Sequence, residues 1–161
     1  ETAWLFTPWP LAIMLVGPVA GRLADRFNPS LLSSTGLLLL IVGLVALALV
    51  DESTGVAGSL WRTALCGIGF GLFQPPNNRE MMGSLPPERS ANVSGVMSTT
   101  RTVGQSLGVA LVGAALALGS PVQLTLWLGA GTTLLALLAS LSRVSLAQRA
   151  LVERRASSVG E

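Results

Sequence analysis

The chain has 161 residues, of which half are hydrophobic and only 11% are charged, whereas an average soluble domain carries about 25% charged residues. Its ten basic residues are all arginines, its eight acidic residues leave a net charge of +2, and it has one cysteine, Cys66, and no histidine. This composition excludes a histidine-dependent catalytic triad, a metal site built from histidines or several cysteines, and an internal disulfide. We therefore expect a protein that is not an enzyme, with no catalytic residue, no metal site and no cofactor.

Long uncharged runs predict five membrane-spanning helices. A helical span needs about 20 mostly apolar residues, and the uncharged runs cover 2–21, 27–50, 63–78 and 102–142. The last run is long enough for two helices joined near Gly119-Ser120-Pro121. A soluble bundle of this size lacks the interior volume to bury every face of such helices. We predict an all-α membrane domain over 1–142, with helices at about 3–22, 30–50, 57–78, 88–118 and 121–142, and a tail over 143–161.

The arginines record the orientation of these helices. Eight of the ten fall in the first and third connections or in the tail, and none falls in the second or fourth connection. Because cytoplasmic loops carry the excess of basic residues, we expect the first helix to begin outside the cell and the tail to be cytoplasmic. The orientation in the membrane thus accounts for the excess of basic residues. The lipid bilayer is the expected partner, and no nucleic-acid partner is expected.

The second and fifth predicted helices are almost free of polar side chains, which is typical of helices that face lipid. The third helix differs from them. Its Gly67 and Gly71 are four residues apart, a spacing that favours close helix packing. Polar residues follow within one to two turns, at Gln74, Asn77 and Asn78.

The fourth predicted helix carries the same glycine spacing, at Gly104 and Gly108, together with a polar face that includes Arg101 and Gln105. A charged side chain within a span costs about 2.5–3.5 kcal/mol. Arg101 therefore faces either a water-filled cavity, a partner helix or, by snorkelling, the cytoplasmic surface. Our hypothesis is that a cavity or its cytoplasmic neck is lined by Gln74, Asn77, Asn78, Arg101 and Gln105.

Several motifs carry a family resemblance. The connection Gly21-Arg22-Leu23-Ala24-Asp25-Arg26 resembles the G-x-L-a-D-R loop motif of the major facilitator superfamily. Residues 62–78 (RTALCGIGFGLFQPPNN) and 101–110 (RTVGQSLGVA) look like the last helices of its fourteen-helix drug/proton antiporter branch, the multidrug exporters of the EmrB/QacA type. The family motif continues with Gly and a basic residue, whereas this chain has Asn28 and Pro29, which suit the N-cap and first position of a helix.

The resemblance implies that this chain is the C-terminal portion of a bacterial plasma-membrane transporter, with the final five of fourteen helices. The implied function is proton-coupled multidrug efflux by alternating access, which would contribute to antibiotic resistance. The implied partners are the missing N-terminal helices, protons and a small cationic or amphipathic drug. Proton coupling would use carboxylates in those missing helices, because the acidic residues here all fall at the edges of the predicted spans or outside them.

Three alternatives stay open from the sequence. The chain could belong to a major facilitator transporter for another solute, such as a sugar, a peptide or a siderophore, or to a small structural or channel subunit. The loop motif is interpreted either as a gating latch made of Gly21, Asp25 and Arg26 or as a plain basic loop.

Overall fold

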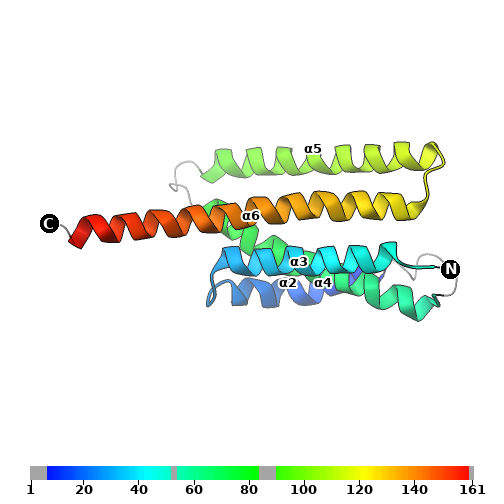
Figure 1. Ribbon diagram of the computed structural model, residues 1–161, viewed down its shortest axis with the longest axis horizontal. Coiled ribbons are helices and arrows are strands. Elements are labelled where there is room, and N and C mark those ends of the chain that lie inside the picture. The colour runs from blue at the N-terminus through cyan, green and yellow to red at the C-terminus, as the bar shows by residue number, and fades with distance from the viewer. Residues whose placement is uncertain (1–6, 52–53, 84–89, 160–161) are drawn as a thin grey trace.

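The computed structural model describes residues 7–51, 54–83 and 90–159, with side chains described for 7–51, 54–83 and 94–142. These ranges form five α-helices, as Figure 1 shows, which confirms the predicted all-helical class and the number of helices in this part of the chain. The helices are α2 (Pro8–Leu23), α3 (Pro29–Ala48), α4 (Val56–Gly83), α5 (Ser90–Ala117) and α6 (Val122–Val159).

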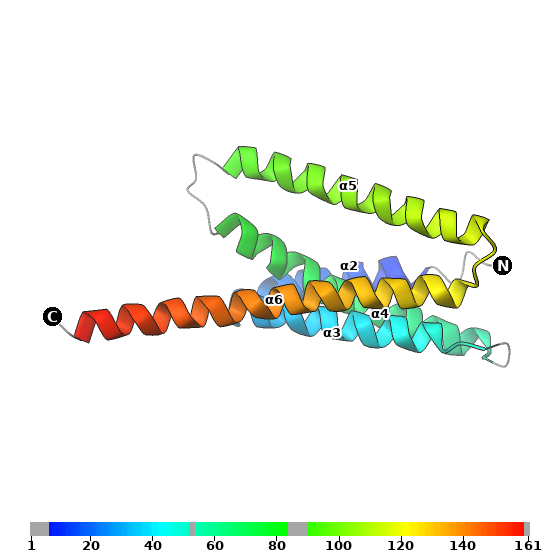
Figure 2. The ribbon, with the colours of Figure 1, turned by 45° about the horizontal axis from the view of Figure 1, so that its top comes forward.

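Two helices are longer than the sequence predicted. α4 ends at Gly83 rather than near 78, and α6 continues past 142 to Val159 instead of ending where the tail was expected to begin. Residues 143–159 contain no proline or glycine, and eleven of these seventeen residues are Ala, Leu, Arg, Gln or Glu, which are strong helix formers, so nothing in the sequence ends the helix at the membrane boundary. In Figures 1 and 2 this extension projects beyond the other helices.

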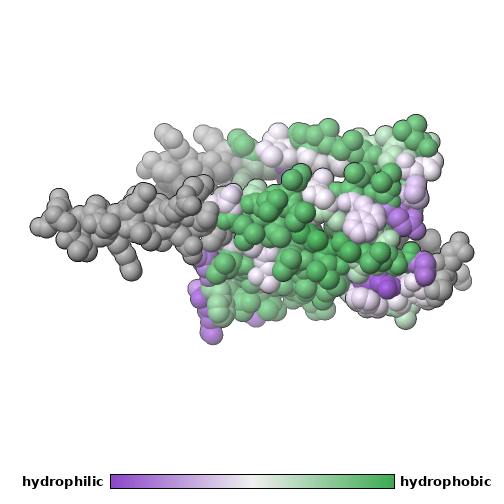
Figure 3. Space-filling model, in the orientation of Figure 1, coloured by the Kyte–Doolittle hydropathy of each residue, from purple (hydrophilic) through white to green (hydrophobic). Residues whose placement is uncertain are grey.

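Three of the helices in the described ranges are long and apolar enough to cross a membrane, namely Pro29–Ala48, Val56–Gly83 and the part of α6 from Val122 to Ser142. α2 has only 16 residues in its described helix, and Arg101 and Gln105 lower the hydropathy of α5, which is itself continuous. The predicted count of five spans therefore stays a prediction. Figure 3 shows a broad hydrophobic band over the helices with hydrophilic residues at its two ends, the surface pattern of a protein embedded in lipid.

α3 and α4 approach each other backbone to backbone. A Cβ atom added at Gly36 would lie 2.5 Å from the amide nitrogen of Phe73, and one added at Gly69 would lie 2.5 Å from that of Leu40. A further close contact lies nearer the Ala48 end of α3, where a Cβ at Gly43 would lie 2.6 Å from the Cys66 sulfur of α4. Small residues at these positions let two helices pack closely where lipid supplies no hydrophobic force between them.

α2 packs on another face of α4. A Cβ atom at Gly67 would lie 2.6 Å from the carbonyl oxygen of Trp9, and one at Gly71 would lie 3.2 Å from the Val16 side chain. Gly67 and Gly71 therefore lie where α4 comes closest to α2. With α3 against its other face, α4 is held between α2 and α3.

α6 packs against the side of α3 that α4 leaves open. At this contact the hydroxyls of Ser34 and Ser140, both buried, are 3.0 Å apart. Ser34 Oγ also donates to the carbonyl oxygen of Ser30 at 2.8 Å, so Ser140 is the donor to Ser34. The four helices are thus packed in the order α2, α4, α3 and α6.

α5 stands apart from these four helices, as Figures 1 and 2 show. Between 94 and 117 its side chains are exposed, except those of Met97 and Ala115, which are half-buried. A Cβ atom at Gly104 or Gly108 would meet no atom within 4 Å. The packing role predicted for these two glycines stays a prediction.

The glycine contact between α3 and α4 gives a direct test. Replacing Gly69 by alanine places a methyl group against the α3 backbone, which cannot yield as a flexible side chain can, and we expect a loss of about 1–3 kcal/mol of stability. The measurement is the thermal unfolding of the purified full-length protein in detergent. Gly131→Ala on α6, where a Cβ meets nothing within 4 Å, is the matched control. Equal unfolding temperatures for the two variants would contradict the contact.

Candidate functional site

The connection between α2 and α3 is tied to the last turns of α4 at two points. Asp25 forms an ion pair with Arg79, although both side chains remain more than half exposed. Ser30 Oγ donates a hydrogen bond of 2.6 Å to Glu80 Oε1. Because Arg79 and Glu80 are neighbours on α4, this helix holds the connection on both sides of its turn. We call this end of the molecule the loop end.

The turn between these two ties is fixed by the start of α3. Asn28 is the N-cap of α3, where its side-chain oxygen accepts a hydrogen bond from the Ser30 amide at 3.0 Å, and Pro29 is the first helical residue. This confirms the capping role predicted from the sequence. The cap satisfies an otherwise unpaired amide, and the fixed φ of proline suits the first turn.

The three residues of the predicted latch lie differently in this connection. Asp25 is in the ion pair, Arg26 is exposed, and a Cβ atom at Gly21 would meet no atom within 4 Å. Of these three residues, Asp25 is the one whose side chain makes a contact among the described residues. The gating role of all three residues stays a prediction.

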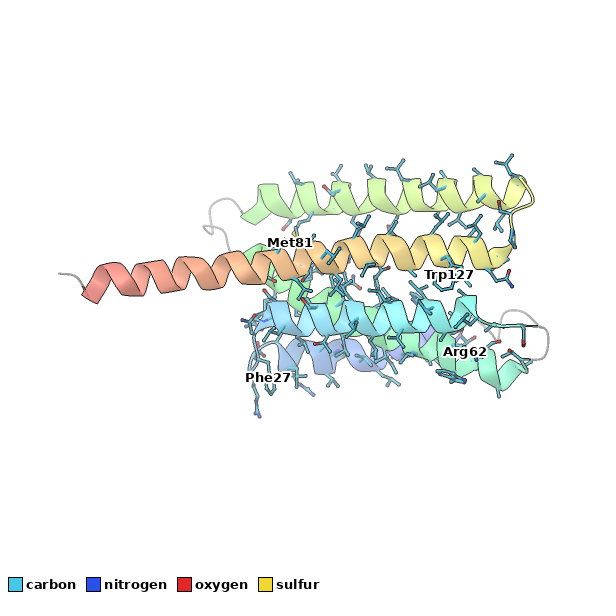
Figure 4. All side chains as sticks on the ribbon, viewed as in Figure 1. Phe27, Arg62, Met81 and Trp127 are labelled. Carbon is cyan, nitrogen blue, oxygen red and sulfur yellow. The ribbon has the colours of Figure 1, made fainter. Side chains whose placement is uncertain are left out.

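Besides Arg101, one other arginine falls inside a predicted span and not at its edge, and this residue, Arg62, lies at the opposite end of the bundle. Arg62 Nη1 donates to the carbonyl oxygen of Gly58 at 3.1 Å, and the Arg62 guanidinium lies 4.9 Å from the centre of the Trp61 ring. Figure 4 shows Arg62 and Trp127 toward this end, and Phe27 and Met81 at the loop end. The two ends thus differ in their contacts: the loop end has the ion pair between Asp25 and Arg79, and the opposite end has the Arg62 guanidinium over the Trp61 ring.

Two of the five predicted cavity residues meet between α4 and α5. With the Gln74 amide oriented so that its oxygen faces α5, this oxygen accepts hydrogen bonds from the Arg101 guanidinium, at 3.2 Å from Nη1 and closer to Nη2. Gln74 is half-buried and Arg101 is exposed. By the rise of an α-helix, each lies about 15 Å from the loop-end terminus of its helix.

The other three predicted residues lie near this pair without joining it. Asn77 contacts the sulfur of Met81 at 3.9 Å, Asn78 is half-buried, and Gln105 is exposed one turn beyond Arg101. A second contact between α4 and α5 joins Ser94 Oγ to the Met82 sulfur at 3.6 Å. The cavity itself stays a prediction.

Sequence reasoning missed the partners at the loop end. It placed Asp25 and Arg79 on the same side of the membrane but did not pair them, and it gave no role to Ser30 or Glu80. The distribution of arginines carried part of the signal, because opposite charges in connections on one side are candidates for pairing. It did not show that the end of α4 lies beside the α2–α3 connection.

Comparison with known proteins supports a single family. A family model described as the Major Facilitator Superfamily matches residues 1–159. The chain is 47% identical over 112 residues to the uncharacterized transporter YebQ of Escherichia coli, which covers 70% of this chain and 24% of that protein. It is 33% identical over 116 residues to the multidrug resistance protein Stp of Mycobacterium tuberculosis, covering 72% and 21%.

A third relative has a different named substrate. The riboflavin transporter RibZ of Clostridioides difficile is 25% identical over 107 residues, which covers 66% of this chain and 24% of that protein. No solved structure matches the chain. The chain spans about a quarter or less of the length of these three relatives. With a family model that matches nearly all of its residues, the chain belongs to the major facilitator superfamily, whose members are membrane transporters and not enzymes.

Proposed function

We propose that this chain is the C-terminal portion of a proton-coupled efflux pump for amphipathic drugs, which works by alternating access. The observation that carries the proposal is the contact between Gln74 and Arg101, a polar pair about 15 Å from the loop-end termini of α4 and α5. A charged group at such depth is costly in lipid, which favours a place beside a water-filled substrate path. The relative named a multidrug resistance protein supports drugs as the substrate class.

In this proposal, proton coupling depends on carboxylates outside this chain. The carboxylates whose side chains are described, Asp25, Asp51 and Glu80, lie at the ends of helices or in connections. None of these three is placed at the depth of Arg101. The chain supplies one wall of the substrate path and a contact at the loop end that opens and closes with it.

The loop end is proposed to be cytoplasmic, in a bacterial plasma membrane. Arg22, Arg26 and Arg79 lie at this end, and cytoplasmic loops are enriched in arginine. The start of α2 then lies toward the outside, and α6 ends in the cytoplasm. The ion pair between Asp25 and Arg79 is the contact that we assign to the latch.

A second candidate function is transport of another solute by the same mechanism. It is favoured by the resemblance to a protein named as a riboflavin transporter, although at lower identity than the drug-resistance relative. The two candidates differ in the solute, and both are tested by one experiment.

That experiment measures accumulation of fluorescent amphiphiles and of riboflavin in bacteria that lack their own drug pumps and express the complete protein. We expect severalfold lower dye accumulation, and we expect a protonophore to abolish the difference. Unchanged dye accumulation with increased riboflavin uptake would favour the second candidate. Dye extrusion that persists after the proton gradient collapses would contradict proton coupling.

Accessibility to water tests the proposed path. Single cysteines at positions 74, 77, 78, 101 and 105, in a full-length Cys66→Ala protein, should react with a membrane-impermeant thiol reagent applied to inverted vesicles. Ser33→Cys is the control, because Ser33 is 1% exposed. We expect labelling at least severalfold faster than at this control. Protection of all five positions to the level of the control would exclude a water-filled path here.

The latch is tested by exchanging its charges. Exposed ion pairs contribute about 0.2–1 kcal/mol, so Asp25→Asn should change transport by no more than about fivefold. Asp25→Arg and Arg79→Asp bring like charges together and should reduce transport further, and the double exchange should restore it. Arg22→Gln, an exposed arginine in the last turn of α2, is the control. No recovery in the double exchange would argue against the pair as a latch.

A further inference from the structure

One face of α4 combines apolar and polar side chains in a single stripe. Phe70, Gln74, Asn78 and Met82 are four residues apart, so they lie above one another on the helix. The printed contacts bring this stripe to α5, where Arg101 meets Gln74 and Ser94 meets Met82. Gln74 and Met82, which are two helical turns apart, therefore border α5, whereas the Phe70 ring lies 6.3 Å from the Trp9 ring of α2.

The positive charge of Arg101 has no carboxylate partner within the described side chains. Among the described side chains, Asp25 forms its ion pair with Arg79, and Glu80 accepts a hydrogen bond from Ser30. Asp51 lies beyond the end of α3 that is remote from the loop end. The acceptor that Arg101 does meet is the neutral amide oxygen of Gln74.

A guanidinium group matches a carboxylate better than an amide. It presents a planar fork of N–H donors that binds the two oxygens of a carboxylate in parallel, and this bidentate geometry between opposite charges adds both energy and specificity. The Gln74 amide offers one oxygen to both Nη atoms. The same positive charge repels a cationic group that approaches this part of the path.

We propose that Arg101 is a specificity-determining residue that binds the carboxylate of an amphipathic organic acid, with Gln74 as the internal acceptor that the substrate replaces. This rests on the proposed efflux function and names the substrate class of that same site. The apolar body of the acid lies along the stripe from Gln74 toward Met82, against the adaptable Met82 thioether.

The test uses the purified full-length protein and three fluorescent probes: pyrenebutyrate, its neutral amide pyrenebutyramide, and the cation ethidium. Equilibrium binding is measured by fluorescence anisotropy, and transport is measured in proteoliposomes with an imposed proton gradient. We expect wild-type protein to bind the acid more tightly than the amide. Arg101→Gln should weaken binding of the acid by about tenfold or more, as removal of a charged hydrogen bond does, and change binding of the amide by less than about twofold.

Two further variants separate binding from folding. Gln74→Leu removes the internal acceptor and should tighten binding of the acid, a gain that a merely disrupted structure does not produce. Arg101→Lys keeps the charge but loses the fork, and its affinity for the acid should fall between those of wild type and Arg101→Gln. Thr99→Ala is the control, because the Thr99 hydroxyl bonds to the Gly95 carbonyl of its own helix.

The two readouts keep this inference separate from the proposed function. Equal weakening of the acid and the amide by Arg101→Gln, or wild-type binding of ethidium and the amide without the acid, would overturn the role of Arg101. Selective binding of the acid that depends on Arg101, with no gradient-driven movement of any probe, would support the binding role and contradict the efflux function.

Discussion

The close approach of the α3 and α4 backbones is the constraint on which the rest of this structure depends. Lipid is as apolar as leucine, so helices in a membrane gain little from hydrophobic burial and associate through close packing. Gly36 and Gly69 provide such packing, because either position would clash with the opposing backbone if it carried a Cβ. Once α4 is seated on α3, its Gly67 meets α2, and Gln74 comes within reach of α5.

The sequence was sufficient to predict five helices and the cap at Asn28, and it assigned the connections to sides of the membrane, an assignment that stays a prediction. Each of these depends on local patterns, namely uncharged runs, arginine counts and a turn signature. It also predicted that Gln74 and Arg101 serve a common cavity, and the structure brings their side chains into contact. The cavity itself remains a proposal, because one contact between two helices does not enclose a volume.

Other features could not be predicted, because they depend on which helices are neighbours. The run from Gly36 to Val50 has no strongly polar side chain and so resembles a lipid-facing helix, yet Gly36 and Gly43 lie at its contact with α4. Hydropathy measures polarity and does not register where a small residue allows contact. The pairing of Asp25 with Arg79 joins residues 54 positions apart, which no local pattern connects. The end of α6 was placed too early, because a change in polarity at 142 does not interrupt helix propensity.

The double tie at the loop end has a mechanical consequence. While both contacts are made, Arg79 and Glu80 hold the α2–α3 connection before and after the turn at Asn28 and Pro29, so a rotation of α4 about its axis would carry this connection with it. These three helices therefore behave as one lever, whereas α5 has few contacts that would couple it to them. Gln74 belongs to the lever and Arg101 to the separate helix. The distance between these two side chains therefore measures the displacement of α4 relative to α5. A spectroscopic label at each position would report this distance in ångströms.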